Sequence, residues 1–475
     1  MIEMLVASLL GATLGTIVGL TPALGVLTVI SILLPFLIGA SAPMVGLIFV
    51  ISIYYSAQYS GSTTSILFKL PGETSSIVTC IDGHELALKG QAGRAIFIAA
   101  FSSFFAGVAA AGIIYFISPV VSILFTKLTP VETFMLTALG LYFSVTSFSS
   151  QHGTSSSIST TLFALCFGLL LSFVGINAMS GAVRFTGGVD YLYDGFKVTV
   201  LAAGLIGGAE IFPKLFIKSN HFSLSAIKIS VRSSWADIKL SFNSILRGTT
   251  IGSVVGFVPG GGAIVAALLA YSIEGKITKD VGSGAIQAVA SPEAANNAAA
   301  QTSLIPLLTL GIPENAVTGL IFALMLSSGI PFGPTFFADP SLLQGLVICI
   351  LVGNLLALIL NLPLVNLSTK LFLIPEKIMY TMIGVILLVG VYFINRDWWD
   401  VLLLLIMSVV GVLLTHVKIP TIPVVMGFVL GPILEDRFNK SLMISNGDLG
   451  VFLNSWVLQL IILSFVIWFI AKKAK

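Results

Sequence analysis

Residues 341–363 read SLLQGLVICILVGNLLALILNLP, an apolar run that contains no charged residue. About 20 such residues give an α-helix the length to cross the hydrocarbon core of a bilayer. Similar runs occupy residues 98–118, 378–394 and 451–470. Because these runs recur from end to end, no large soluble domain is hidden between them. The pattern therefore predicts an all-α polytopic membrane protein.

The composition supports the same class of protein. Of the 475 residues, 56% are hydrophobic and 9% are charged, and the mean hydropathy is +1.06, whereas a soluble domain has roughly a quarter of its residues charged. The net charge of +3 comes from scattered basic residues, so no nucleic-acid footprint is expected. The N-terminus lacks the basic region of a cleavable signal, so we expect it to be retained. These features indicate a membrane-embedded protein, and we expect it in the inner membrane of a bacterium.

Motifs for several other functions are missing. The chain has no phosphate-binding Gly-x-x-x-x-Gly-Lys-Ser/Thr loop and no His-Glu-x-x-His pair. Cys80, Cys166 and Cys349 have neither pairing nor metal-ligand spacing, so they are interpreted as small apolar side chains. We therefore expect no enzyme, no ATP-driven pump and no bound cofactor apart from a coupling Na⁺ or H⁺.

A basic segment divides the chain near its middle. Residues 213–247 hold six basic residues and one acid, Asp237. The positive-inside rule places this connector in the cytoplasm. It separates a first membrane repeat, residues 1–212, from a second, residues 248–475. The three lysines after residue 471 suggest a cytoplasmic C-terminus, which requires an extra helix at the end of the second repeat.

The repeat is visible in small residues that recur at a constant offset. Its first copy consists of Gly11, Thr13, Gly15, Val18, Gly19, Pro22 and Gly25, and its second copy of Gly248, Thr250, Gly252, Val255, Gly256, Pro259 and Gly262. The first copy opens without a basic residue, whereas the second opens directly after Arg247. We therefore expect two inverted-topology repeats with broken helices and re-entrant hairpins.

Each half also carries a later proline break, at Pro71 and at Pro313. Interrupted segments at matching positions in two halves are the best sequence indication of a transporter binding site. Residues 60–82 are too short on each side of Pro71 to span a bilayer, so they predict a re-entrant hairpin. Backbone groups freed at such a break are tolerated when they face protein or a water-filled cavity.

Polar residues around the two breaks supply candidate ligands. Hydroxyls there can serve an anionic substrate or an alkali cation, or they can bond back to the preceding helical turn. We assign the following residues to substrate binding: Ser62, Thr63, Thr64, Lys69, Pro71, Gly72, Pro259, Gly260, Gly261, Thr309, Gly311, Pro313, Glu314 and Asn315. Lys69 and Glu314 each lie within two residues of a break, so we expect them to approach each other or one cavity. The alternative is that Lys69 extends to the membrane interface.

A second group is assigned to ion coupling. Glu293, Asn296 and Asn297 share nearly one face if the segment is helical. Together with Thr79, these residues are assigned to ion coupling. Their oxygens could hold a sodium ion, for which Asn296 and Asn297 are the candidate ligands. Alternatively, Glu293 could hold a proton. The alternative is a solvated helix start, because Glu293 directly follows Pro292.

Taken together, these strings resemble the large membrane subunit of the tripartite tricarboxylate transporter family over most of the chain. The likeness is most specific in residues 54–93, through Tyr59, Gly61, Ser62, Thr64, Ile66, Leu67, Pro71, Gly72, Glu73, Asp82, Gly83, Gly90, Ala92 and Gly93, with Ala95 just beyond. It is also specific in residues 256–313, through Pro292, Glu293, Ala295, Asn296, Asn297, Ala298, Ala299 and the run from Leu304 to Pro313.

The resemblance implies a secondary transporter that imports small carboxylates with a cation gradient. It also implies two partners, a small membrane subunit and a periplasmic solute-binding protein. The sequence departs from the family pattern at Lys69, Glu314 and Asn315, where Asn, Gly and Ser are common. An acid beside an anion site disfavours citrate unless Lys69 offsets it, which leaves open a smaller, a less charged or a non-carboxylate solute. A passive channel or membrane scaffold is the alternative, although unlike hairpins in one chain favour a carrier.

Overall fold

The structure is a computed structural model that describes residues 2–21, 25–38, 42–69, 71–125, 128–151, 158–177, 180–215, 235–257, 262–371, 376–456 and 459. These residues are almost entirely helical, apart from one two-stranded antiparallel hairpin. Five helices are long and apolar enough to cross a membrane: Ile2–Leu20, Pro43–Phe68, Ala92–Ile123, Pro340–Asn361 and Trp398–His416. The predicted all-α polytopic class is confirmed.

The first half contains long apolar helices and one hairpin. Its elements are α1 (Ile2–Leu20), α2 (Val26–Ile38), α3 (Pro43–Phe68), η1 (Thr74–Ile77), α4 (Thr79–Leu88), α5 (Ala92–Phe125), α6 (Pro130–Gln151), α7 (Ile158–Ser172), β1 (Gly175–Ile176), β2 (Val183–Arg184), η2 (Asp190–Leu192), α8 (Val198–Ala202), η3 (Ala203–Gly208) and α9 (Ala209–Lys214). The segment η3 is a π-helical stretch that continues α8 into α9.

Within the described residues of the second half, all regular elements are helices. Its elements are α10 (Trp235–Phe257), α11 (Gly262–Ile277), α12 (Gln287–Thr302), α13 (Leu304–Leu310), α14 (Ala316–Ser327), α15 (Pro334–Phe337), α16 (Pro340–Leu371), α17 (Glu376–Asn395), α18 (Trp398–His416), α19 (Thr421–Ile444) and α20 (Gly450–Leu453).

The apolar runs fall where they were expected, with two qualifications. Residues 98–118, 341–363 and 378–394 lie in α5, α16 and α17, whereas most of 451–470 lies outside the described residues. The predicted connector, residues 213–247, overlaps the end of α9 and the start of α10, and residues 216–234 between these helices lie outside the described residues. In α10, Ile238 and Ile245 are buried and Leu240 is exposed.

A glycine-lined contact joins the first and third helices of the first half. A β-carbon on Gly15 would lie well inside van der Waals contact with the backbone oxygen of Ile53, and Gly19 meets Ala57 in the same way. A glycine repeated every four residues keeps one helix face flat, so the backbones of α1 and α3 approach closely. A later residue of α1 contacts a later residue of α3, so the two helices run parallel.

The second half repeats this contact with α10 and α12. Gly252 abuts the backbone of Ala295, and Gly256 abuts that of Ala299. These two helices are therefore also parallel. Gly15 and Gly252 come from the recurring sequence pattern, so the repeat recognised in the sequence corresponds to a repeated packing contact.

The two helix pairs run in opposite directions. The side chains of Tyr59 on α3 and Gln301 on α12 meet at one place, on Asn354 of α16. Further along α3, Ser62 lies beside Glu293, which is earlier in α12. Because a later residue of α3 lies beside an earlier residue of α12, these two helices are antiparallel. Both helices lie in the interior of the protein. In the most apolar stretch of α3, 83% of the residues are buried, and in α12 every residue from Ala288 onward is buried.

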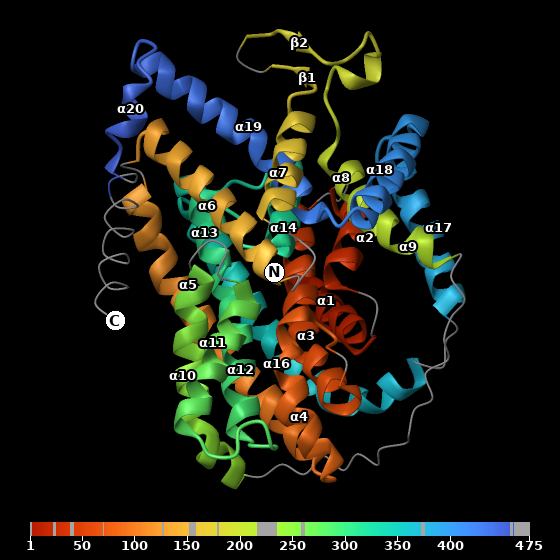
Figure 1. Cartoon of the computed structure of the whole chain (residues 1–475), viewed down its shortest axis with the longest axis vertical. Coiled ribbons are helices and arrows are strands. Elements are labelled where there is room, and N and C mark those ends of the chain that lie inside the picture. Colours follow the sequence, from red (N-terminus) through yellow and green to blue (C-terminus); the bar gives the residue numbers. More distant parts are fainter. Residues whose placement is uncertain are drawn as a thin grey trace.

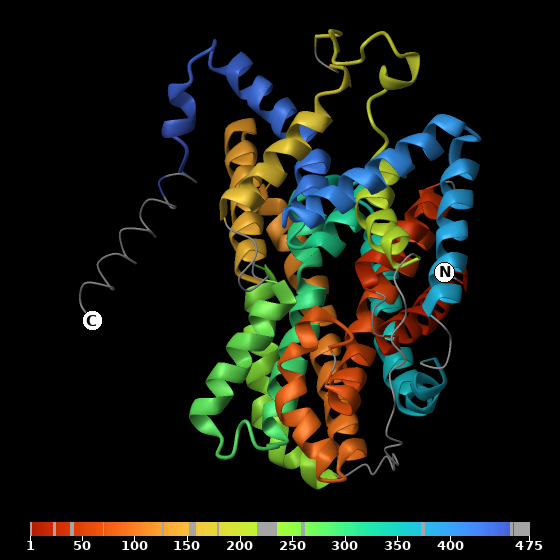
Figure 2. The same ribbon diagram turned by 45° about the vertical axis from the view of Figure 1, so that its right-hand side comes forward.

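The elements are arranged along a long axis. Figures 1 and 2 show the β1–β2 hairpin at one end, and α4 with the start of α10 at the other. At the latter end, Asp82 of α4 is fully buried and accepts hydrogen bonds from the backbone N–H groups of Gly282, Gly284 and Ala285 at 2.8–2.9 Å. The hydroxyl of Tyr271 donates to the same carboxylate at 2.8 Å. Asp82 thus fastens the first half to the loop that precedes α12.

Asp82→Asn is expected to lower the free energy of unfolding by about 2–4 kcal/mol, because an amide cannot accept all of these bonds and leaves buried donors unpaired. Thermal unfolding of the full chain in detergent measures the change. Asp280→Asn is the matched control, since Asp280 is an exposed residue of the same loop with a φ of 64° that asparagine tolerates. Equal stability of the two variants would contradict this role of Asp82.

Candidate functional site

Both proline breaks have the same backbone geometry. Helix α3 ends at Lys69 in the left-handed region (φ 57°, ψ 25°), and α13 ends at Gly311 in that region (φ 67°, ψ 27°). The N–H of each donates to a carbonyl four residues back, and a proline follows two residues later, at Pro71 and Pro313. Since the residue before a proline is disfavoured in the helical region, both helices stop here. The two breaks are structurally equivalent.

The first break folds back on the two central helices of its half. The N–H of Gly72 donates to the carbonyl of Gly61 at 3.3 Å. A β-carbon on Gly72 would collide with the carbonyl oxygen of Gly19 and with the hydroxyl of Thr64. Only glycine fits between α1 and α3 at this point. The neighbouring residues Lys69 and Pro71 are exposed.

Residues 60–68 differ from the prediction. They do not form the short limb of a hairpin but complete the 26-residue helix α3. The physical reason is that the hydroxyls bond back to the preceding turn: Ser62 donates to the Tyr59 carbonyl at 2.6 Å and Thr64 to the Gly61 carbonyl at 2.9 Å. Thr309 does the same in α13, with the Ile305 carbonyl at 2.6 Å. These hydroxyl oxygens can still accept a hydrogen bond or coordinate a cation.

The second break is buried. Glu314 is 2% exposed, and its carboxyl group accepts hydrogen bonds from the Gly262 N–H at the start of α11 and from Asn315 Nδ2 at 2.7 Å. Asn315 also caps α14, where its Oδ1 accepts from the Thr318 N–H at 3.0 Å. Asn315 Nδ2 further donates to the Tyr54 hydroxyl at 3.2 Å. The neighbouring candidates Pro259, Gly260 and Gly261 lie outside the described residues.

In the structure, the partners of the Glu314 carboxyl group are Gly262 and Asn315 and not Lys69, and whether Lys69 and Glu314 face one cavity stays a prediction. Glu314 lies at the level of Tyr54 on α3, whereas Lys69 ends that helix fifteen positions later. At 1.5 Å per residue the two levels are roughly 22 Å apart. Instead, Glu73 and Glu314 both lie within electrostatic reach of the Tyr54 hydroxyl.

The residues assigned to ion coupling come together inside the protein. Glu293, Asn296 and Asn297 are at most 1% exposed, and Thr79 donates a hydrogen bond to Glu293 Oε1. Asn297 Nδ2 donates to Ser103 Oγ at 2.7 Å. Glu293 Oε2, Asn297 Oδ1 and both side-chain polar atoms of Asn296 have no hydrogen-bond partner in the structure. Buried polar atoms without partners are rare, so this cluster is a candidate ligand site.

A central polar cluster was missed by sequence reasoning. The Tyr59 hydroxyl donates to Asn354 Oδ1 at 3.0 Å, and Gln301 Nε2 donates to the same oxygen at 2.7 Å. Nearby, the Thr63 hydroxyl donates to Asn361 Oδ1 at 3.1 Å. A signal was available, because Asn354 and Asn361 interrupt the apolar run 341–363, and amides within membrane helices commonly bond across helices.

Gly107 makes room for this cluster. A β-carbon there would lie 2.5 Å from Asn354 Oδ1 and 2.6 Å from Gln301 Nε2. Gly107→Ala is therefore expected to lower the free energy of unfolding by about 1–3 kcal/mol through overpacking and displaced amides. Thermal unfolding tests this, with Gly112→Ala in the same helix as the control, because nothing lies within 4 Å of its added β-carbon. If both alanines are tolerated equally, the cluster is not tightly packed.

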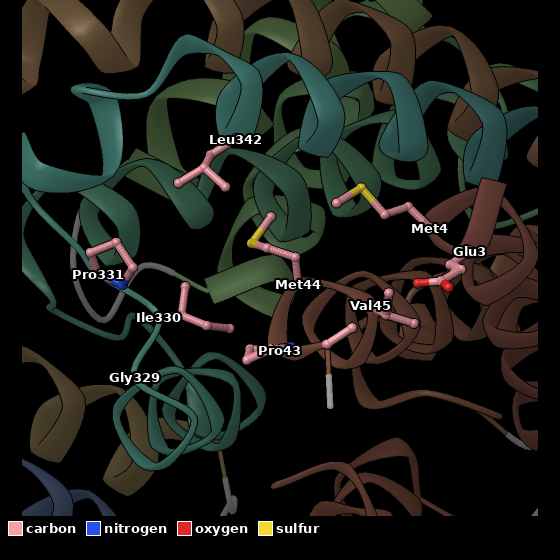
Figure 3. A pocket seen from close by; sticks show the side chains of 10 residues that line it. Glu3, Met4, Pro43, Met44, Val45, Gly329, Ile330, Pro331 and Leu342 are labelled. Carbon is pink, nitrogen blue, oxygen red and sulfur yellow. The ribbon is translucent and has the colours of Figure 1, made fainter. Parts of the chain in front are cut away.

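Two cavities lie away from the breaks. One, of about 280 Å³, is lined by Glu3, Met4, Met44 and Ile330, together with further apolar residues near the starts of α1 and α3 (Figure 3). The other, of about 600 Å³, lies between Lys89, Arg94 and the loop before α12. No cluster of three His, Cys, Asp or Glu residues with metal-binding geometry occurs within the described part of the chain. The candidate site is the buried polar interior around Glu293, Asn296 and Asn297.

The helices, the spans and this interior define a multi-pass membrane protein whose polar centre is formed by buried side chains of α3, α12 and α16. Comparison with known proteins makes the assignment more specific. The chain belongs to the tripartite tricarboxylate transporter TctA family, which it matches over residues 5–426. It is a membrane component of that family of transporters.

Two relatives come from Agrobacterium vitis. The chain is 40% identical over 449 residues to an "Uncharacterized 52.8 kDa protein in TAR-I ttuC' 3'region", which covers 94% of this chain and 88% of the relative. It is 42% identical over 208 residues to an "Uncharacterized protein in TAR-II ttuC' 3'region", which covers 43% of this chain and 86% of the relative. No solved structure matches the chain.

Proposed function

We propose that this chain is the permease subunit of a secondary active transporter that imports a small carboxylate into a bacterial cell, coupled to a sodium or proton gradient. Its partners are a small membrane subunit and a periplasmic solute-binding protein that delivers the solute. The observation that carries the proposal is the buried set of unpartnered polar atoms on Glu293, Asn296 and Asn297, between two broken segments of a transporter-family protein.

The two halves are proposed to be inverted-topology repeats, joined by a cytoplasmic connector. The opposite directions of α3 and α12 support this arrangement, as does the equivalent geometry of Lys69 and Gly311. In such carriers the substrate and ion sites lie near the midplane, where discontinuous helices meet. The breaks at Pro71 and Pro313 are the proposed substrate site.

The cluster of Glu293, Asn296 and Asn297 on α12 is the proposed coupling-ion site. Glu293 Oε2 and Asn297 Oδ1 are oxygens without hydrogen-bond partners, and the Ser62 oxygen lies beside the Glu293 carboxylate. The Ser62 hydroxyl, which donates to the Tyr59 carbonyl, is also within hydrogen-bond reach of that carboxylate. A set of carboxylate, amide and hydroxyl oxygens suits a hard cation such as sodium. A proton carried by Glu293 is the alternative coupling ion.

The competing function is a passive channel or a scaffold. Channels commonly place rings of like charges or filter carbonyls around a symmetric pore. The candidate site here is built from two unlike breaks in one chain, one with Gly72 and one with Glu314, which favours a carrier. The two functions differ in whether flux depends on a gradient.

The solute can be identified through the binding protein. A thermal-shift screen of the cognate periplasmic protein against small carboxylates is expected to give a stabilising ligand, and that ligand is then offered to the reconstituted transporter under imposed sodium or proton gradients. If the stabilising ligand carries no carboxylate, the proposed substrate class is wrong. If it is not taken up, the assignment of these partners fails.

A further inference from the structure

The buried polar atoms of α12 that have no partner are of two kinds. Glu293 Oε2 and Asn297 Oδ1 are oxygens, which accept hydrogen bonds or coordinate a cation. Asn297 Nδ2 already donates to Ser103 Oγ at 2.7 Å and to the Glu293 carbonyl at 3.2 Å. With Glu293 ionised, these two residues therefore offer only oxygens to a ligand.

Asn296 offers a donor as well. Its side chain is 0% exposed, and neither its Oδ1 nor its Nδ2 has a hydrogen-bond partner in the structure. A cation can be coordinated by Oδ1, but the N–H groups of Nδ2 need an acceptor. A buried donor without an acceptor is costly and rare in folded proteins. A cation alone therefore does not satisfy Asn296.

At the equivalent position of the first half, the protein itself supplies a partner. Ile53 and Ala295 occupy equivalent glycine contacts, so the residues that follow them, Tyr54 and Asn296, are equivalent as well. The Tyr54 hydroxyl accepts a hydrogen bond from Asn315 Nδ2 at 3.2 Å. Among the described residues, no side chain or backbone group does the same for Asn296. We therefore expect the partner of Asn296 to come from outside the chain.

A carboxylate next to a bound cation is the acceptor that suits Asn296. A charged acceptor strengthens the hydrogen bond from an amide N–H, and a cation on Oδ1 polarises the amide in the same sense. Asn296 follows Glu293 by three residues, so the two side chains are neighbours on one face of α12. A second carboxylate placed here is repelled by Glu293 unless a cation offsets the charge.

We propose that Asn296 contacts both ligands of the transporter: its Oδ1 coordinates the coupling cation, and its Nδ2 donates to a carboxylate oxygen of the solute. This inference rests on the proposed coupled transport of a carboxylate and names the residue that joins solute to ion. Solute and cation then bind side by side on α12, and each raises the affinity of the protein for the other. Without the cation, Glu293 repels the solute.

Two simpler roles for Asn296 have different consequences. If Asn296 coordinated the cation alone, a saturating cation concentration would compensate for the loss of its side chain. If an internal water were its partner, replacing it would leave the affinity for carboxylates unchanged. Only direct contact with the solute makes carboxylate affinity fall at every cation concentration.

The test measures binding to the purified full chain by titration calorimetry, with acetate, succinate and propane-1,2,3-tricarboxylate as probes. Each titration is repeated at rising sodium concentrations up to saturation and, in a second series, at falling pH. The wild type is expected to bind at least one probe about 10-fold or more tightly with the cation than without it. Asn296→Leu should weaken that binding by about 10-fold or more at every cation concentration. Asn454→Leu, at an exposed asparagine, is the control and should keep the wild-type affinity.

Two aspartate variants separate the contacts of Asn296 and carry the test if Asn296→Leu does not fold. Asn296→Asp keeps an oxygen for the cation and removes the N–H donors, so cation binding without a probe should persist while probe binding is lost. Asn297→Asp adds the same charge nearby but removes no donor that faces a ligand, so it should weaken probe binding less. Equal losses in the two aspartate variants would overturn the inference.

The remaining outcomes distinguish the inference from the function on which it rests. Wild-type probe affinity in Asn296→Leu, either at saturating cation or throughout, would overturn the inference and leave the proposed carboxylate transport standing. A wild type whose probe affinity depends on neither sodium nor pH would also overturn it. A wild type that binds none of the three probes would overturn the proposed function and the inference together.

Discussion

Gly252→Val is expected to prevent most of the protein from folding in the membrane. The valine β-carbon would meet the backbone of Ala295, which cannot move aside because α12 is buried along its length. Separating α10 from α12 loses the close backbone contact that holds the second half together, so the cost should reach about 3 kcal/mol or more. The yield of monodisperse protein after detergent extraction measures the effect.

A matched control separates this contact from a general intolerance of valine. Gly112 lies in the middle of α5 with nothing within 4 Å of an added β-carbon, so Gly112→Val should give near wild-type yield. Gly15→Val, at the equivalent contact of the first half, should fail as Gly252→Val does. Normal yield from both Gly15→Val and Gly252→Val would mean that these contacts do not organise the two halves.

The second large effect concerns the coupling ion. Replacing Asn296 and Asn297 together by alanine is expected to weaken the sodium or proton dependence of uptake by roughly 100-fold or more, since interactions with a charged ligand contribute about 1.5–3 kcal/mol each. Because several polar atoms of these side chains have no protein partner, their removal should cost little stability. The half-saturating cation concentration for uptake in vesicles is the quantity to measure.

Asn454→Ala provides the comparison, because this asparagine is exposed at the end of α20. Its cation dependence should match that of the wild type. An unchanged half-saturating concentration in the Asn296 and Asn297 variant would remove both residues from the ion site and leave Glu293 as a proton carrier to be tested alone.

Sequence patterns predicted the parts of this fold that depend on local chemistry. Apolar runs identified α5, α16 and α17, and the recurring glycines marked two segments in which Gly15 and Gly252 make equivalent contacts. The helix stops before Pro71 and Pro313 followed from the backbone restriction that proline imposes. Each of these features is determined by residues close together in the chain.

Features that depend on distant parts of the chain were harder to predict. Asn354 joins Tyr59 to Gln301 across three helices, and nothing in the local sequence indicates that the three converge. Lys69 and Glu314 were expected to approach each other or one cavity because they flank equivalent breaks, but equivalent positions in oppositely directed halves need not be adjacent. The distance of a residue from a break gives its position along the helix, but it does not determine which residues of other helices lie opposite that residue.

The central claim is that the two halves form a carrier whose flux is coupled to an ion. The most direct test is uptake of the identified carboxylate into proteoliposomes that contain the full chain with its small membrane subunit and binding protein. The account predicts accumulation above the outside concentration when an inward sodium or proton gradient is imposed, and collapse to equilibrium when an ionophore dissipates it. Equal flux with and without a gradient, and without the binding protein, would contradict the account and indicate a channel.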